Sequence, residues 1–128
     1  MTKTLQQVMA EYPDLTAWGF CNQTDLENDR KILADSESDF EFCVQWIREN
    51  VRPSEHFDYS LYRTSYGLKH TAEAQSPKKY LRNGTFIAAW IALGDRKWER
   101  IADTPNARLA LWRSDEKAIE CGNRRKIR

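Results

Sequence analysis

The longest apolar run in the chain constrains its fold more than any other feature. Eight consecutive apolar residues, 86–93, lie within the stretch YLRNGTFIAAWIALGD that runs from Tyr80 to Asp95. A helix without a polar face is buried on all sides, so the run predicts a central core helix. Gly94 follows it and favours the left-handed conformation with which many helices end. Only the polar turn before the run, 82–85, is then open to a ligand.

Apolar spacing and cap residues predict further helices. The clearest begins at Ser38, where Ser38 and Glu41 form a Ser-x-x-Glu capping box. Its apolar stripe recurs every three or four residues, at Phe40, Cys43, Val44, Ile47 and Val51. The other segments with helical spacing or caps are 4–12 (cap Thr4), 25–35 (cap Thr24), 60–75, 105–114 and 116–121. We therefore predict one all-α domain over residues 1–128, a bundle of about six helices. Residues 95–103 favour a turn with a short helix, and a strand pair there is the minor alternative.

The helices predicted within 60–94 have the outline of a helix-turn-helix, in which the second helix reads the major groove of DNA. Basic residues surround the connector and could neutralise phosphates. Because the run from residue 86 is apolar, base contacts are confined to the turn before it. There Arg82 could pair with guanine, Asn83 with adenine, and Thr85 with a phosphate or a thymine methyl. The predicted nucleic-acid contacts are Lys69, Lys78, Lys79, Arg82, Asn83, Thr85, Arg124 and Arg125, the last two in a basic tail, 123–128.

The turn at 82–85 also allows two simpler interpretations. A helix N-terminus carries partial positive charge and free N–H groups, so it could bind a phosphate or carboxylate, with Gly84 permitting close approach. Alternatively, Asn83-Gly84 is a turn and Thr85 an ordinary N-cap. Three tryptophans could stack on bases, although their spacing favours core packing: Trp90, Trp98 and Trp112.

Charge divides the chain into an acidic half, 1–60, and a basic half, 61–122, followed by the basic tail. Residues 1–60 hold 5 Lys+Arg and 12 Asp+Glu, a net of −7, whereas residues 61–128 hold 15 and 7, a net of +8. Such a split indicates a half that binds a polyanion, or two halves whose charges pair on folding. The acidic residues that could instead face a protein partner are Asp25, Glu27, Asp29, Glu37 and Asp39.

Several classes of protein are disfavoured. The chain has no phosphate-binding loop, dinucleotide fingerprint, HExxH or GxSxG motif, so we expect no enzyme and no cofactor. Three widely spaced cysteines and two histidines predict neither disulfides nor a metal site. No apolar run approaches the length of a membrane span, and no signal peptide is evident, so we expect a cytoplasmic protein.

One pattern in the basic half resembles a known group of proteins. Its residues are Ser65-Tyr66-Gly67-Leu68-Lys69-His70, Tyr80, Asn83-Gly84-x-Phe86-Ile87-Ala88-Ala89, Leu93-Gly94 and Asn106. This order is similar to small uncharacterised proteins of bacteriophages and integrated mobile elements, over about residues 60–115. The resemblance implies a phage or mobile-element setting in a bacterial host cell, and it carries no catalytic role.

Two functions are compatible with these observations. In the first, a small accessory or regulatory protein binds DNA, with little or no sequence preference, through its basic half; a homodimer is one arrangement that this function permits. In the second, the protein inhibits a host defence system, as anti-CRISPR proteins do, by covering a nuclease complex with its acidic or its basic half. The first predicts an affinity for duplex DNA that falls steeply with salt, and the second predicts a stable complex with a defence protein.

Overall fold

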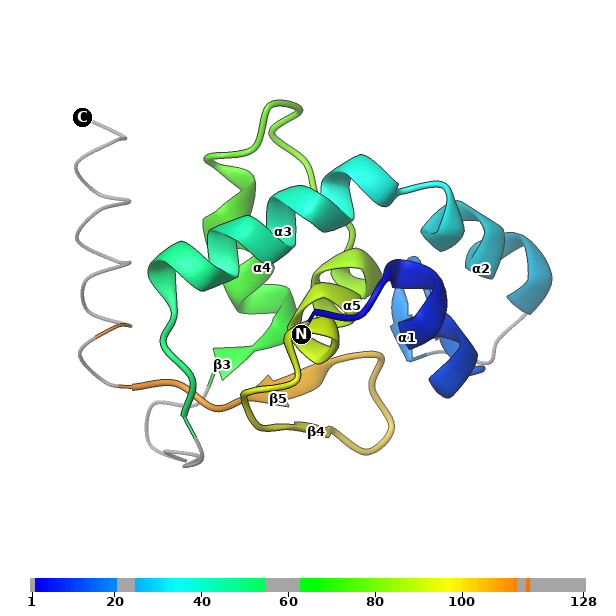
Figure 1. Ribbon diagram of the computed structural model, residues 1–128. Coiled ribbons are helices and arrows are strands. Elements are labelled where there is room, and N and C mark those ends of the chain that lie inside the picture. The colour runs from blue at the N-terminus through cyan, green and yellow to red at the C-terminus, as the bar shows by residue number, and fades with distance from the viewer. Residues whose placement is uncertain (1, 21–24, 55–62, 113–114, 116–128) are drawn as a thin grey trace.

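The described part of the chain is a small mixed fold of helices and short strands. The structure is a computed structural model, and it describes residues 2–20, 25–54, 63–112 and 115. Within these residues it contains five helices and five strands (Figure 1). In chain order they are α1 (Leu5–Glu11), β1 (Leu15–Thr16), β2 (Gly19–Phe20), α2 (Leu26–Ala34), α3 (Glu37–Asn50), β3 (Arg63–Thr64), α4 (Ser65–Glu73), α5 (Asn83–Leu93), β4 (Trp98–Arg100) and β5 (Ala107–Leu109).

The prediction of an all-α fold is wrong because two antiparallel sheets are present. Strands β1 and β2 form a hairpin, and the second sheet has the order β3-β5-β4. The predicted helix at 105–114 contains β5, in which Ala107 and Leu109 are buried and Arg108 between them is half-buried. This alternation has the period of two that belongs to a strand. The alternative of a strand pair within 95–103 is half right, since β4 lies there but pairs with β5.

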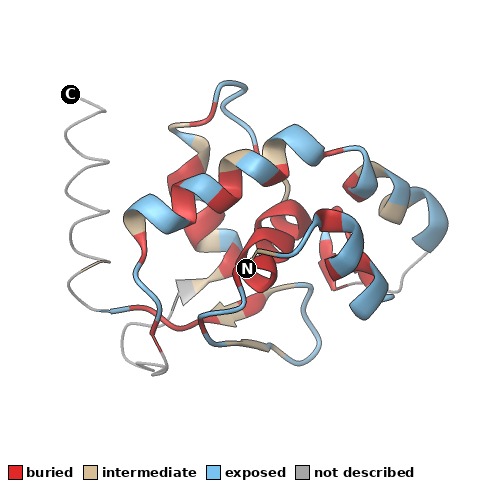
Figure 2. Ribbon diagram, in the orientation of Figure 1, coloured by how far each residue is buried: buried red, intermediate tan, exposed pale blue. Residues whose placement is uncertain are grey.

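Helix α5 lies at the centre of the core, as the apolar run predicts. All eleven of its residues are buried, and Figure 2 shows it as a continuous buried helix. In the view of Figure 1, α3 runs above α5, while β4 and β5 lie below it. The helix ends at Gly94, which has a φ of 71° in the left-handed region and so confirms the predicted end.

The outer helices follow their predicted apolar faces more closely than their predicted caps. The five stripe residues of α3 are all buried, and burial raises the pKa of the Cys43 thiol. However, α3 begins one residue before Ser38, with Ser36 as its N-cap and without a side-chain cap. Thr4 caps α1 as predicted, within a capping box, and Asp25 caps α2.

The predicted helix-turn-helix is not formed. A helix-turn-helix joins its helices by a turn of about three or four residues, but the segment 74–82 separates α4 from α5. Its second helix must also project into a DNA groove, and every residue of α5 is buried. Reading of the major groove by this helix is therefore excluded in the described fold.

Several predictions fall outside the described residues. These are the last helix at 116–121, the tail with Arg124 and Arg125, and the cap Thr24. In the part of the chain that the structure describes, no helix is both long enough and apolar enough to cross a membrane.

Arg30 on α2 holds the end of α1 in place. Its guanidinium donates hydrogen bonds to the carbonyl oxygens of Met9 (2.8 Å), Tyr12 (2.8 Å) and Leu15 (2.9 Å). These carbonyls lie at the C-terminus of α1 and at the entry to β1, where no helical N–H is available to them. One planar side chain therefore connects α1, α2 and the hairpin.

We expect Arg30→Lys to lower the free energy of unfolding by about 2 kcal/mol, because a lysine ammonium cannot span three carbonyls as the guanidinium fork does. Urea denaturation of the purified variant measures this. Arg48→Lys, at an exposed position on α3, is the matched control and should change stability by less than about 0.5 kcal/mol. Equal effects of the two changes would show that the three carbonyl contacts contribute little.

Candidate functional site

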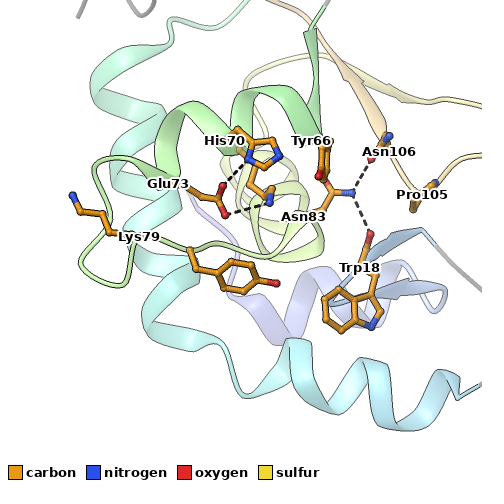
Figure 3. Close-up of a pocket in the computed structure, with 10 residues that line it drawn as sticks. Trp18, Tyr66, His70, Glu73, Lys79, Asn83, Pro105 and Asn106 are labelled. Carbon is orange, nitrogen blue, oxygen red and sulfur yellow. Dashed lines mark hydrogen bonds and ion pairs between the residues drawn. The ribbon is translucent and has the colours of Figure 1, made fainter. Parts of the chain in front are cut away.

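A pocket of about 640 Å³ opens where α4, the segment before α5 and the β1–β2 hairpin meet. Figure 3 shows its residues coming from segments far apart in the chain. The lining residues are Trp18, Tyr66, Lys69, His70, Glu73, Lys79, Tyr80, Asn83, Pro105 and Asn106. Three of the residues predicted to contact nucleic acid are among them: Lys69, Lys79 and Asn83.

Exposed aromatic side chains concentrate at this pocket. Trp18 is 45% exposed, Tyr66 51% and Tyr80 45%, and these are the most exposed large hydrophobic side chains among the described residues. Trp18 lies in the β1–β2 turn, Tyr66 in the first turn of α4, and Tyr80 in the segment before α5. Solvent-exposed aromatic rings grouped around one pocket are typical of binding sites.

Lys69 is a cation held beneath two of these rings. It is only 5% exposed, and its Nζ lies 4.9 Å from the centroid of the Tyr66 ring and 5.7 Å from that of Tyr80. One helical turn later, Glu73 accepts a hydrogen bond of 3.3 Å from the same ammonium. The carboxylate and the two electron-rich ring faces together compensate the cost of burying this charge.

Glu73 connects α4 to the segment that leads into α5. Besides Lys69, its carboxylate accepts hydrogen bonds from the Leu81 backbone N–H (2.9 Å) and lies 2.7 Å from His70 Nδ1. Burial by itself would raise the pKa of Glu73. The Leu81 N–H and Lys69 outweigh burial, so the pKa is lowered. Glu73 is therefore ionised at neutral pH. Its bond to Leu81 holds in place the segment 78–82, which carries Tyr80 and is called the rim below.

The rim contains two lysines and an arginine. Lys79 has a φ of 57°, which is unusual for a residue other than glycine, and its Nζ donates to the Ala74 carbonyl at the end of α4 (2.7 Å). Lys78 is exposed and lies 3.7 Å from Asp39. The Arg82 guanidinium lies 5.6 Å from the Tyr80 ring centroid. Lys69 and Arg82 thus lie against tyrosine rings, and Lys79 lines the pocket beside them.

The first turn of α5 is filled by the protein itself. The Gly84 N–H donates to the Ala17 carbonyl (3.0 Å), and a Cβ at Gly84 would lie 1.7 Å from the Thr16 carbonyl oxygen. The close approach that Gly84 permits is therefore that of the β1–β2 hairpin and not of a phosphate. Thr85 is also buried, and its hydroxyl hydrogen-bonds that of Ser36 (3.0 Å), so it is neither an N-cap nor open to DNA.

Asn83 is the first residue of α5 and forms part of the pocket wall. Its Nδ2 donates to the Trp18 carbonyl (3.2 Å) and to Asn106 Oδ1 (3.0 Å), which ties the hairpin to the loop before β5. The residue is 7% exposed, and its Oδ1 has no hydrogen-bond partner among the described residues. In Figure 3 the carboxamide lies between Tyr66 and Trp18.

The acidic residues proposed for a protein partner form two groups. Asp25, Glu27 and Asp29 lie at the N-terminus of α2, and Glu37 and Asp39 lie in the first turn of α3. Negative charge at a helix N-terminus stabilises the helix, which supplies a structural reason for both groups. They lie at opposite ends of α2, roughly 13 Å apart along a nine-residue helix.

Ion pairs between the acidic and basic halves account for part of the charge split. Arg100 makes two hydrogen bonds to the Asp14 carboxylate (2.6 and 2.9 Å), and Lys78 lies near Asp39. The interpretation in which the halves pair on folding is therefore correct for these residues.

Sequence reasoning missed the aromatic residues of the pocket and chose other tryptophans. Trp90 is buried in the core, and Trp98 stacks on Phe20 with ring centroids 5.6 Å apart. Trp112 is exposed but its Nε1 donates to the Pro53 carbonyl (2.8 Å), away from the pocket residues. A usable signal was that Trp18 lies outside the predicted helices, where no apolar stripe requires an aromatic ring.

Known proteins supply no further information about this site. Among the described residues, no group of three or more His, Cys, Asp or Glu side chains could hold a metal ion. Comparison of the chain with protein families, curated proteins and solved structures finds no match. The resemblance of residues 60–115 to phage and mobile-element proteins therefore stays a prediction.

Proposed function

We propose that this protein binds nucleic acid at the pocket face, as an accessory protein of a phage or mobile element. The observation that carries the proposal is the concentration of three half-exposed aromatic rings around a pocket that Lys69 and Lys79 also line. Aromatic rings stack on bases and cations neutralise phosphates, and nucleic acid offers both at short spacing.

The charges of this face favour an anionic ligand. Among the described residues, Glu73 is the only carboxylate that lines the pocket, and it is paired with Lys69. Lys79 and the neighbouring Lys78 and Arg82 then leave the rim positive. The Lys78 side chain is 68% exposed, although its partner Asp39 is only 13% exposed, and at 3.7 Å the contact is long, so the ammonium could also approach a phosphate.

Neutralising the rim should weaken binding in a salt-dependent way. We expect the double variant Lys78→Gln, Lys79→Gln to bind a DNA strand about tenfold more weakly than the parent at low salt, because two phosphate contacts are lost. The slope of log K against log salt should fall by roughly 0.7 to 0.9 for each lysine. Fluorescence anisotropy of a labelled oligonucleotide at several salt concentrations measures both quantities.

The matched control is Lys31→Gln, an exposed lysine of α2 that does not line the pocket. It changes the net charge in the same way as each rim substitution and should leave the affinity within about twofold. Equal losses from Lys31→Gln and from a single rim substitution would indicate nonspecific attraction. Unchanged DNA binding by the double variant would remove the proposal.

Inhibition of a host defence complex is the second candidate. Asp25, Glu27 and Glu37 are exposed and could face a basic nuclease surface. We rank this function lower because the two acidic groups are separated by α2 and each stabilises a helix N-terminus. The absence of any affinity for DNA, together with a stable complex with a purified defence nuclease, would reverse this order.

A further inference from the structure

We propose that the pocket accepts one unpaired base of a single strand, with the adjoining phosphates on the lysine rim. This inference rests on the proposed nucleic-acid binding and specifies its ligand. It concerns which form of nucleic acid the aromatic rings accept, whereas the test of the proposed function measures what the lysines contribute to binding any nucleic acid. The two statements can therefore fail separately.

The position of Lys69 decides which class of aromatic ligand fits. Aromatic rings grouped with a carboxylate commonly form a cage for a ligand cation. Here the cation beside Tyr66 and Tyr80 is the protein's own Lys69, which is nearly buried and paired with Glu73. A second cation would meet like charge at this place. The remaining ring surface therefore suits a neutral planar group whose substituents are anionic, as a base with its phosphates is.

The shape of the face favours an unpaired base over a duplex. In a duplex the π faces of the bases are covered by their neighbours, so a base can reach a pocket only when it is unstacked. The helix that the sequence suggested for reading a groove, α5, is buried throughout and cannot enter one. A concave site rimmed by Trp18, Tyr66 and Tyr80 instead accepts one planar ring from a strand that passes over it.

Two features of the pocket fit this ligand in detail. Asn83 forms part of the wall between Tyr66 and Trp18, and its buried Oδ1 lacks a donor among the described residues (Figure 3). The N–H groups on the edge of a base are donors of the required kind. Lys79 lines the pocket and Lys78 precedes it in the chain, and both side chains are exposed. In the unbound protein their ammonium groups contact the Ala74 carbonyl and Asp39, so a phosphate beside a base on Tyr80 would draw them from these contacts.

The test compares three labelled probes of equal length, about ten nucleotides each: a single strand, the same strand in a duplex, and a strand of the same charge whose sites are abasic. We expect the parent protein to bind the single strand about 5- to 150-fold more tightly than the abasic strand, which is the range of one stacked base. The duplex should also bind more weakly than the single strand. Anisotropy at fixed salt gives the three affinities without any substitution in the protein.

Variants then assign the effect to the rings. Tyr66→Ala, Tyr80→Ala should reduce the preference for the single strand over the abasic strand to less than about twofold, whereas Tyr66→Phe, Tyr80→Phe, which keeps both π faces, should retain it. Trp18→Ala, in the β1–β2 turn, should lower the same preference. It replaces the tyrosine variant as the test if circular dichroism shows that the tyrosine variant is unfolded.

The outcomes separate the two proposals. Equal affinities of the parent for single, duplex and abasic strands, with the dependence on Lys78 and Lys79 retained, would overturn the unpaired base and leave nucleic-acid binding in place. A preference for the single strand that survives in the double tyrosine-to-alanine variant and in Trp18→Ala would also overturn it. Failure to bind any of the three probes would overturn both proposals.

Discussion

Gly84→Ala should lower the free energy of unfolding by about 3 kcal/mol or more, because the added methyl group overlaps the backbone of the β1–β2 hairpin. The added Cβ would lie 1.7 Å from the Thr16 carbonyl oxygen and 2.9 Å from the Ala17 carbonyl carbon. Both neighbours are backbone atoms and cannot rotate away. The hairpin must therefore move and lose the hydrogen bond from the Gly84 N–H to Ala17. Urea denaturation followed by circular dichroism measures the loss.

The control for this prediction is Gly67→Ala in α4. Gly67 is also a helical glycine, but the nearest atom to its added Cβ is the Thr64 hydroxyl at 3.4 Å. Alanine is about 1 kcal/mol better than glycine within a helix, so this change should be neutral or slightly stabilising. Similar losses at Gly67 and Gly84 would contradict the explanation by hairpin contact and indicate a general intolerance of these helices to alanine.

Glu73→Gln should also cost about 3 kcal/mol at neutral pH, because it leaves the nearly buried Lys69 without its counter-charge. The loss should depend on pH. The pKa of Glu73 in the folded protein is below its ordinary value of 4.5, so folding favours the ionised form. The contribution of the ionised Glu73 to stability is therefore complete above about pH 4.5, and it is lost as pH falls through the pKa of Glu73 in the folded protein. Urea denaturation of parent and variant at several pH values from about 7 to about 3 should show the difference between their free energies of unfolding shrink toward zero as pH falls.

The control for Glu73 is Asp14→Asn, which removes a carboxylate from an ion pair that is far more exposed. It should cost less than about 1 kcal/mol. A double variant, Lys69→Met with Glu73→Leu, should recover much of the loss, because it removes both buried charges together. If Glu73→Gln and Asp14→Asn cost the same at pH 7, or the loss persists below the folded-state pKa, the buried pair is not the cause.

The prediction of the fold succeeded where a local pattern was long. The unbroken run at 86–93 and the five-residue stripe of α3 each extend over at least two helical turns, and both were predicted at the correct places. The prediction failed for the short strands. Strand β5 spans only Ala107–Leu109, and a Thr104-Pro105 pair before it is an equally good helix start. Its partners are β3 and β4, so no pattern within the segment could identify it.

The candidate site was predicted in part. Lys69, Lys79 and Asn83 do line the pocket, and the basic character of this region is visible in the sequence. The aromatic residues were missed because Trp18 lies 48 residues before Tyr66 in the chain, and nothing in the sequence indicates that they meet. The predicted DNA contact at Thr85 does not fit, since that residue is buried against Ser36.

The sequence by itself determined that residues 86–93 form the central helix, because eight consecutive apolar side chains leave water only by burial on every side. It also determined where the cations gather. Tertiary structure decided what surrounds the start of that helix. The hairpin occupies the N–H of Gly84 and closes the anion site that the local pattern suggested. The same packing brings Trp18 beside the tyrosines of the basic half and forms the pocket, because contacts between distant segments depend on how helices and strands pack together.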